Sequence, residues 1–411
     1  MHTHVVIIFM VINFQLFQTD GNIIGNIIWF LLFFVMMFVY PRLMVTQMIW
    51  KLEQTAGMLE GFTHTARRIV TRKITKSPTK ELRDSIGNFL DFFVIEPVSL
   101  DPYGIVKKIE HLVDLSEKRF KYFVKRTAPK LDSENQANLM MGLSGAITLN
   151  QITKIVKHYI GIIKKTKNLQ LAMILQMQMP FIEKMSKALL KGTESLTNGW
   201  PIGDAAGAMV AVHLIGDSKV KEFDEDTVVS TRRIKGKTVY IIKARGPGGR
   251  LGKIGKVVDR YARRQKIAKI ITVDAAAKLE GEKTGSIAEG IGVAIGGVGV
   301  ERFYIENIAS QKDLPLDTYV IKMSHEEAIM PMKTEVLGAV PKVVKMVEGN
   351  IAETKEKGAI IVVGVGNTGG IGNNRKDADK VVDLIKRNAR SLKEWEEQEL
   401  KKEKKWFDLG F

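Results

Sequence analysis

The sequence predicts a membrane-anchored chain in which an all-α domain precedes an α/β domain with a mainly parallel sheet. Three observations lead to this fold class: one uncharged apolar run near the N-terminus, helical periodicity after it, and strand-like runs alternating with helical runs in the C-terminal half. We divide the chain into an N-terminal extension (1–21), a transmembrane helix (22–44), a helical juxtamembrane domain (45–192), an α/β domain (193–390) and a charged C-terminal helix (391–411).

The N-terminal apolar run has the length of a membrane span. No charge occurs between Ile23 and Tyr40, and with its flanks this run supplies the ~20 residues that a bilayer-spanning helix needs. Arg42 is the first basic residue, and lysines and arginines cluster after it. A cleaved signal peptide is the alternative, but it would carry a basic segment in front of the apolar run. We therefore expect a single-pass protein of the cell membrane whose soluble domains are cytoplasmic.

A second apolar stretch, residues 4–17, is too short to span a bilayer in the usual way. It is either a second partial span or an extension that results from an early start codon. The first of these alternatives would weaken the topology argument.

Composition excludes some kinds of chemistry. The chain has no cysteine, which excludes disulfides, thiolate-bound zinc, iron–sulfur clusters and a cysteine nucleophile. The net charge of +17 favours anionic partners such as lipid headgroups or nucleic acid. The excess charge is spread along the chain, and the basic run 232–269 has only Tyr240 and Tyr261 for base stacking. We therefore expect the lipid bilayer as a partner and do not expect nucleic acid.

Apolar residues recur every three or four positions through residues 45–195, which predicts helices. Ser77-Pro78 and Glu96-Pro97 interrupt the pattern. Methionines between Asn168 and Gly192 recur at helical spacing, and we interpret them as core packing rather than a lipid or partner groove.

From about Thr193 the pattern alternates between strands and helices, which predicts a mainly parallel sheet covered by helices. The predicted strands are Thr238–Lys243, Ile267–Val273, Thr318–Lys322 and Ala359–Val365. The predicted helices are Ala205–Leu214, Gly255–Gln265, Glu335–Glu348 and Lys376–Asn388.

Two glycine-rich loops follow predicted strands and are candidates for binding an anion or cofactor. Their glycines are Gly246, Gly248 and Gly249 in the first loop and Gly364, Gly366 and Gly369 in the second. Arg245 and Arg250 flank the first set, so that loop has the composition of an anion cradle. The second has the G-x-G-x-x-G spacing of a phosphate-binding turn, but no following strand carries the acid that would bind a ribose. Dinucleotide binding is therefore disfavoured.

Three side chains near element ends form the strongest candidate site. Asp204 opens a predicted helix, Asp274 ends a predicted strand within the glycine-rich stretch 271–302, and His325 follows another strand. Two carboxylates and an imidazole at one rim of a sheet can bind a divalent metal ion with open coordination positions. Alternatively, two paired carboxylates can activate water, one protonated and one ionised. Taken singly, Asp204 is also explained as an N-cap, Asp274 as a strand-end cap, and His325 as one of seven histidines.

These stretches resemble the superfamily of germination proteases and hydrogenase-maturation proteases. The shared motifs are Asn198-Gly199 with Gly203–Gly207, then Val273-Asp274-Ala275, then Ser324-His325. The resemblance implies a phosphorylase/hydrolase-like α/β fold and peptidase activity, with Asp204, Asp274 and His325 as the catalytic or metal-contacting residues. In that superfamily the first motif follows a strand, whereas here it follows a helical stretch. The run 359–370 resembles the missing strand and its Gly-Asn turn, which would make the sheet permuted.

The apolar anchor, the helical domain and the stretches Gly246–Gly249 and Leu279–Gly290 together resemble an archaeal membrane-anchored family of unknown function (domain of unknown function 1512). This resemblance implies anchoring and no established activity. We expect a hydrolase at the cytoplasmic face that acts on a protein or peptide, with a divalent metal ion as a candidate cofactor. The alternative is a non-enzymatic membrane scaffold whose glycine-rich loops bind an anion or a partner protein.

Overall fold

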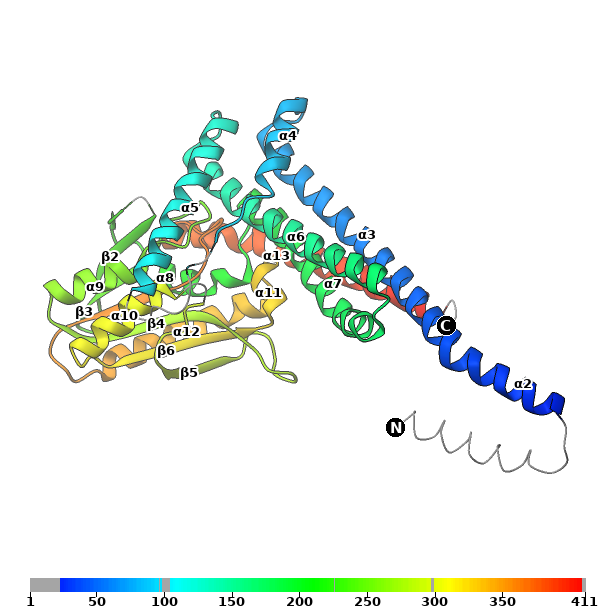
Figure 1. Ribbon diagram of the computed structural model, residues 1–411. Coiled ribbons are helices and arrows are strands. Elements are labelled where there is room, and N and C mark those ends of the chain that lie inside the picture. The colour runs from blue at the N-terminus through cyan, green and yellow to red at the C-terminus, as the bar shows by residue number, and fades with distance from the viewer. Residues whose placement is uncertain (1–22, 96, 98–103, 225, 297–298, 409–411) are drawn as a thin grey trace. The chain divides into compact units, whose positions relative to one another are not determined.

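A computed structural model describes residues 23–95, 97, 104–224, 226–296 and 299–408 (Figure 1). The predicted N-terminal extension (1–21) lies outside these residues. Contacts divide the chain into two compact units, which we describe separately. The first contains the described residues up to Met58 together with Lys154–Glu183, and the second contains Leu59–Thr153 together with the described part of Lys184–Phe411.

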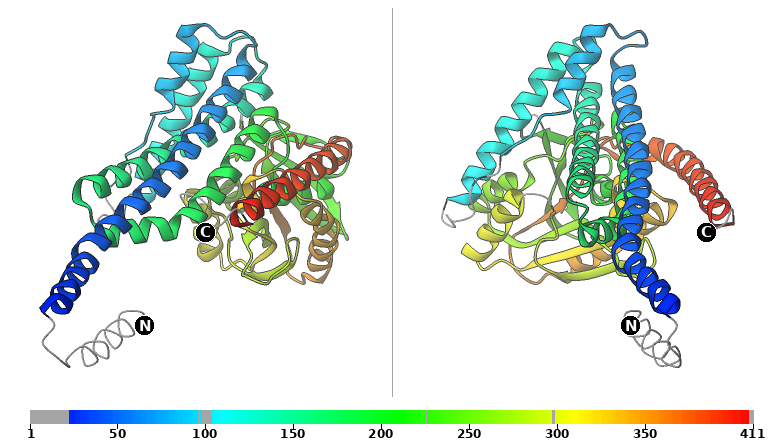
Figure 2. Two further views of the ribbon diagram at one scale, coloured as in Figure 1. Left: turned by 90° about the vertical axis from the view of Figure 1, so that its right-hand side faces the viewer. Right: turned by 45° about the vertical axis from the view of Figure 1, so that its right-hand side comes forward.

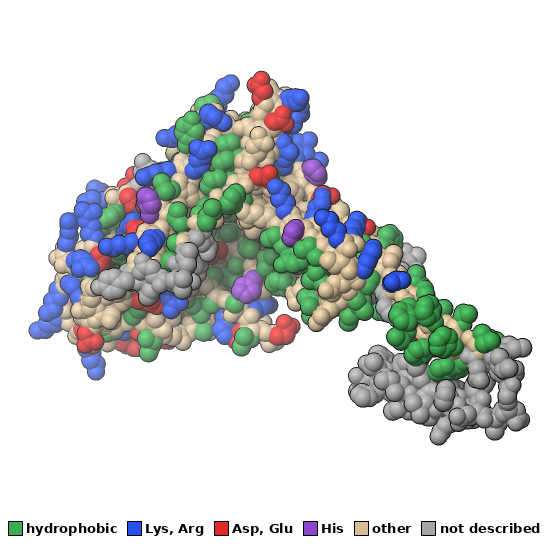
Figure 3. Space-filling model, in the orientation of Figure 1, with side chains coloured by type: hydrophobic (Ala, Val, Ile, Leu, Met, Phe, Trp, Pro, Cys, Tyr) green, Lys and Arg blue, Asp and Glu red, His purple; other side chains and the backbone are tan. Residues whose placement is uncertain are grey.

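The first unit begins with an apolar helix. Helix α2 (Ile23–Phe34) continues through a π-helical turn, η1 (Val35–Val39), into α3 (Tyr40–Ile74). Its side chains face outward, and Phe30 is 70% exposed. Figure 3 shows hydrophobic side chains covering this helix at the lower right. It is the one helix among the described residues that is long and apolar enough to cross a membrane, as the sequence predicts.

Helices fill the region before the α/β domain, as predicted. After α3 they are α4 (Lys80–Phe89), α5 (Ile105–Thr127), α6 (Ser133–Thr166) and α7 (Leu169–Asn198). The break at Ser77-Pro78 is confirmed, and the Thr79 side chain caps α4 by accepting a hydrogen bond from the Leu82 N–H at 3.2 Å. In the second unit, Phe89 of α4 stacks on Phe123 of α5 with ring centroids 3.8 Å apart, so aromatic packing joins these two helices.

A mixed seven-stranded sheet forms the centre of the α/β domain, with the order β1-β2-β3-β7-β4-β6-β5. The strands are β1 (Val220–Glu222), β2 (Thr227–Ile234), β3 (Lys237–Ala244), β4 (Ile267–Ala277), β5 (Ile287–Ile291), β6 (Leu316–Met323) and β7 (Ala359–Gly364). The four predicted strands are β3, β7, β4 and β6, and they pair in parallel in that order. Strands β1, β2 and β5 add antiparallel pairs at the two edges.

Helices cover both faces of the sheet and bury two apolar cores. On one face lie α8 (Ala206–Ile215), α12 (Thr334–Glu353) and α13 (Arg375–Asp408), and on the other lie α9 (Ile254–Arg264) and α10 (Val300–Gln311). The four helices predicted in this domain are confirmed as α8, α9, α12 and the start of α13. Figure 2 shows α13, in red, as one unbroken helix, so no structural break separates the predicted C-terminal helix at residue 391 from the preceding helix.

The central strands β4 and β7 end at different levels along the strand direction. The candidate site lies where β4 extends past the end of β7. Val273 of β4 is level with Gly364, the last residue of β7, while β4 runs on to Ala277. Asp274 therefore lies just beyond the carboxyl end of β7. In α/β sheets with parallel central strands, ligands usually bind beyond these strand ends.

Candidate active site

Asp274 and Asp204 both lie at the carboxyl ends of β4 and β7. Asp274 is only 4% exposed and lies within β4. Asp204 lies in a 3₁₀ turn, η2 (Gly203–Ala205), directly before α8, and its side chain is partly exposed. Both residues line the same cavity, and the negative charge of Asp204 contributes to a raised pKa of Asp274.

Two glycines allow the backbone to bring the aspartates together. A Cβ atom on Gly207, in the first turn of α8, would overlap the carbonyl oxygens of Val273 and Val365. Gly366 has a φ of +117°, and a Cβ atom there would overlap the carbonyl oxygen of Asp204. Helix α8 therefore rests its first turn directly on the ends of β4 and β7. This contact requires glycine at position 207, the Gly of the Asp-Ala-Ala-Gly motif.

Hydrogen bonds distinguish the two carboxyl groups. The backbone N–H of Asn367, in the Gly-Asn turn after β7, donates to Asp204 Oδ2 at 2.8 Å. Asp274 Oδ1 accepts from the N–H of the next residue, Ala275, at 2.6 Å. Burial raises the pKa of Asp204, while the Asn367 N–H acts to lower it. Burial raises the pKa of Asp274 well above its usual value, and the charge of Asp204 raises it further. Burial and the neighbouring carboxylate therefore both favour the neutral form of Asp274.

His325 lies at the first position of the short helix α11 (His325–Ile329). Ser324 and Glu327 form a capping box that fixes the start of this helix, with the Ser324 N–H donating to Glu327 Oε2 at 2.8 Å. His325 is exposed and lines the same cavity as Asp204 and Asp274. Within the described ranges, no hydrogen bond or ion pair joins it to either carboxylate, and no three His, Asp or Glu side chains are grouped as metal ligands. The trio therefore shares a cavity without forming a closed coordination set.

The cavity beside the aspartates is large, about 1530 Å³. Its walls combine apolar side chains, such as Leu112 and Phe120 of α5 and Met141 of α6, with charged side chains. Ion pairs attach α5 to the α/β domain, with Lys121 Nζ 2.9 Å from Asp226 and Lys253 Nζ 2.9 Å from Asp114. Helix α5 thus forms one wall of the cavity and lines it both with apolar side chains and with the ion-paired Asp114 and Lys121.

The two predicted glycine-rich loops pack against each other. The Gly370 N–H donates to the Pro247 carbonyl at 2.8 Å, and the Thr368 hydroxyl donates to the Gly248 carbonyl at 2.9 Å. Among the candidate glycines, Gly246 donates its N–H to Asn373 Oδ1 at 3.0 Å. The two loops therefore lie together, held mainly by hydrogen bonds to each other and to neighbouring side chains.

The first loop already cradles an anion, which is the carboxylate of Glu134 on α6. Glu134 accepts from the Gly248 N–H at 2.6 Å and from Arg250 Nη1 at 2.6 Å, and Arg245 Nη2 lies 2.9 Å away. Asn138, one helical turn later, accepts from the Gly249 N–H at 2.7 Å. The sequence analysis missed Glu134 and Asn138. Their spacing of four places them on one helix face, but nothing local to α6 indicates the loop that they bind.

Of the comparisons with known proteins, only the comparison with family models gives matches to this chain. A model described as "Protein of unknown function (DUF1512) N-terminal domain" matches residues 26–199, and one described as "Domain of unknown function (DUF1512) C-terminal" matches residues 202–372. No curated protein and no solved structure matches the chain. The boundary between the two matched regions falls between α7 and the turn that carries Asp204.

Proposed function

Since the chain belongs to the DUF1512 family, whose description assigns no activity, we propose from the site itself that it is a membrane-anchored, peptidase-like hydrolase with Asp204 and Asp274 at its centre. The observation that carries this proposal is the pairing of two carboxyl groups with raised pKa values at the edge of a large cavity. Burying a carboxyl group without a cation costs stability, and such costs are concentrated at functional sites.

The proposed reaction is hydrolysis of an amide bond by general acid–base catalysis. Asp204, ionised and held by the Asn367 N–H, takes a proton from a water molecule as the water oxygen attacks the carbonyl carbon. Asp274, protonated because it is buried beside a negative charge, gives its proton to the leaving nitrogen as the carbon–nitrogen bond breaks. Transfer of one proton from Asp204 to Asp274 then restores the pair. His325, exposed and lining the same cavity, would contact the substrate in this scheme.

The lining of the cavity suggests the class of substrate. The apolar side chains that α5 and α6 contribute to the walls favour peptide segments with apolar side chains, since burying them is favourable at roughly 25 cal/mol per Å². The membrane-length helix would keep the enzyme beside the bilayer, and we infer from the basic residues after Tyr40 that the α/β domain lies at the cytoplasmic face. A membrane-derived or membrane-proximal peptide would suit both features.

Two features support the hydrolase-like, permuted version of the fold. Strand β7 lies between β3 and β4, next to the strand that carries Asp274. Its Gly-Asn turn donates to Asp204, although more than 150 residues separate the two in the sequence. Under this proposal, a C-terminal strand would occupy the position that an N-terminal strand occupies in the superfamily that the motifs resemble.

The metal-dependent form of the proposal uses the same residues. Asp204 and Asp274 would hold a divalent ion, and His325 would join them only after its side chain moved toward the carboxylates. The scaffold alternative has less support, because protein acceptors already occupy the N–H groups of Gly246, Gly248 and Gly249.

Replacing Asp274 by Asn is expected to lower kcat/KM for peptide cleavage by a factor of about 10²–10⁴, the usual contribution of a general acid or base. Asp204→Asn should have an effect of the same size. The full chain in detergent would be assayed against a library of fluorescence-quenched peptides with apolar residues, with and without EDTA and added Mn²⁺ or Zn²⁺. Loss of cleavage in EDTA and its recovery with one metal would identify the metal-dependent form.

Asp379→Asn is the matched control, because Asp379 is an exposed aspartate on α13 that does not line the cavity. It should retain full activity. Circular dichroism would establish that each variant is folded. A folded Asp274→Asn protein with undiminished cleavage would refute the proposal, as would a wild-type chain that cleaves no peptide under any of these metal conditions.

A further inference from the structure

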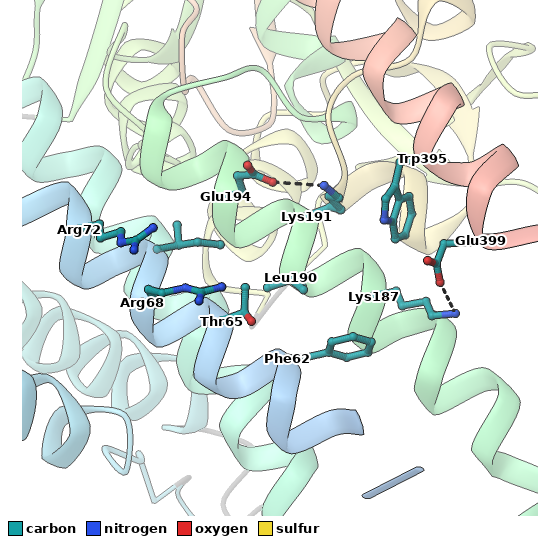
Figure 4. Close-up of a pocket in the computed structure, with 11 residues that line it drawn as sticks. Phe62, Thr65, Arg68, Arg72, Lys187, Leu190, Lys191, Glu194, Trp395 and Glu399 are labelled. Atoms are coloured by element: carbon teal, nitrogen blue, oxygen red, sulfur yellow. Dashed lines mark hydrogen bonds and ion pairs between the residues drawn. The ribbon is translucent and has the colours of Figure 1, made fainter. Parts of the chain in front are cut away.

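A second cavity, of about 350 Å³, lies between α3, α7 and α13 within the second compact unit (Figure 4). Its lining residues all differ from those of the large cavity. The charged residues that line it are Arg68, Arg72, Lys187, Lys191, Glu194 and Glu399. Four cations thus face two acids, an excess of two positive charges in a small space.

Ion pairs within the pocket neutralise its two lysines but not its two arginines. Lys187 Nζ lies 3.1 Å from Glu399, and Lys191 Nζ lies 3.4 Å from Glu194. In the part of the chain that the structure describes, no hydrogen bond or ion pair engages the side chain of Arg68 or Arg72. The excess charge of the pocket therefore resides on two guanidinium groups of α3. Figure 4 shows both side chains extending from α3 on the side that faces α7.

The spacing of the two arginines suits a phosphate group. Positions 68 and 72 are four residues apart and so project from the same face of α3. Guanidinium groups bind phosphate oxygens in a bidentate manner, and a phosphomonoester carries a charge of about −1.5 to −2 at pH 7. One such group would balance the excess charge of the pocket. The Thr65 hydroxyl, one turn earlier on α3, offers a further donor.

The remaining walls suit the organic part of a ligand. Phe62, Ile69 and Leu190 contribute apolar surface, and Trp395 contributes an aromatic ring from α13. Leu392 and Met330 belong to the same apolar cluster as Trp395, which fixes the helix that carries the ring. The Lys191 ammonium lies 5.3 Å from the ring centroid, which holds this cation at the wall of the pocket.

We propose that this pocket binds the phosphomonoester of a small molecule, with Arg68 and Arg72 holding the phosphate and Trp395 contacting the organic part. The ligand is either a soluble phosphomonoester or the headgroup of a lipid such as phosphatidic acid. The phosphate chemistry is common to both sources. The site is independent of the aspartate pair, so binding there needs no peptidase activity.

Isothermal titration calorimetry on the full chain in detergent tests this, with AMP, inorganic phosphate and adenosine as probes. We expect AMP to bind. Inorganic phosphate should bind more weakly than AMP, and adenosine should bind at least tenfold more weakly than AMP. The double variant Arg68→Gln/Arg72→Gln should weaken AMP binding at least tenfold, and Arg68→Lys/Arg72→Lys should fall between it and the wild type. Lys76→Gln/Lys80→Gln removes the same charge from exposed positions beyond α3 and should bind AMP normally.

Repeating the AMP titration in lipid nanodiscs distinguishes the two sources. If phosphatidic acid in the disc blocks AMP binding that phosphatidylcholine permits, the natural ligand is a lipid headgroup, and otherwise it is soluble. Two results would overturn the proposal: no binding of AMP or phosphate at millimolar concentrations, or equal AMP affinity in the wild type and the Arg→Gln double variant.

Discussion

Gly207→Ala is expected to lower the free energy of unfolding by about 3 kcal/mol, the upper end of the usual cost of overpacking. The added Cβ would overlap the backbone oxygens of both Val273 and Val365. Backbone oxygens at the ends of two central strands cannot rotate away as a side chain can. Helix α8 would have to lift from the sheet, and Asp204, three residues earlier, would move away from Asp274.

Urea denaturation of the full chain in detergent, followed by near-ultraviolet circular dichroism, measures this effect. Gly338→Ala is the matched control, because Gly338 lies on the exposed side of α12 and a Cβ atom there would have nothing within 4 Å. That substitution should stabilise the protein by roughly 0.5–1 kcal/mol, since alanine favours helix more than glycine does. A Gly207→Ala protein with the wild-type denaturation midpoint would show that α8 does not depend on this close contact.

The sequence predicts the central strands well because each is a nearly continuous apolar run. Strand β7 is buried along its whole length, and its Ala-Ile-Ile-Val-Val run admits few other interpretations. Strand β2 is not predicted, because Ser230, Thr231, Arg232 and Arg233 interrupt its apolar pattern. Its pairing with β3 stabilises it instead, and that contact is not visible in the local sequence.

The candidate site also combines residues that local motifs predict with residues that only the fold brings to it. Asp204, Asp274 and the Gly-Asn turn are each marked by local motifs, so the aspartate pair could be predicted from strand and helix ends. The partners of the first glycine-rich loop could not, because Glu134 comes from a helix more than a hundred residues earlier. Composition predicts an anion there, and the fold supplies that anion from within the chain. Sequence patterns therefore identify the type of interaction better than its partner.

Lys243 is the clearest residue that the sequence analysis left without a role. It follows the apolar residues of β3 and is fully buried. Its ammonium group donates to the Ala244 carbonyl at 2.7 Å and to Asn373 Oδ1 at 3.0 Å. Burial, aided by the charge of Arg250, lowers the pKa of Lys243 to about 7, although the charge of Asp377 opposes the shift.

The consequence for stability has a definite sign. In the unfolded chain Lys243 has its ordinary pKa of about 10.4, so between pH 7 and that value the unfolded state binds more protons than the folded state. Stability contributed by this residue should therefore rise with pH across this interval, by up to about 1.4 kcal/mol per pH unit. Below pH 7 the folded protein must keep a charged lysine without a paired carboxylate, and the full penalty applies.

Lys243→Met is expected to stabilise the protein by a few kcal/mol at pH 6 and to lose most of that advantage by pH 10. Methionine has a similar volume and keeps the apolar contacts, while the two hydrogen bonds that it loses contribute about 1 kcal/mol each. The measurement is the difference in urea midpoint between variant and wild type at each pH, which removes the titration of all other groups. Lys345→Met, at an exposed position of α12, should change stability by less than about 0.5 kcal/mol at every pH.

The opposite result would be equally informative. If Lys243→Met were less stable than the wild type by the same amount at every pH, the ammonium group would have to remain charged in the folded state throughout. Asn373 would then act as more than a neutral acceptor, since its side chain also bonds the N–H and carbonyl of Gly246. Lys243 would in that case stabilise the junction of the two glycine-rich loops through its charge, and its hydrogen bonds to the Ala244 carbonyl and to Asn373 would compensate the burial of that charge.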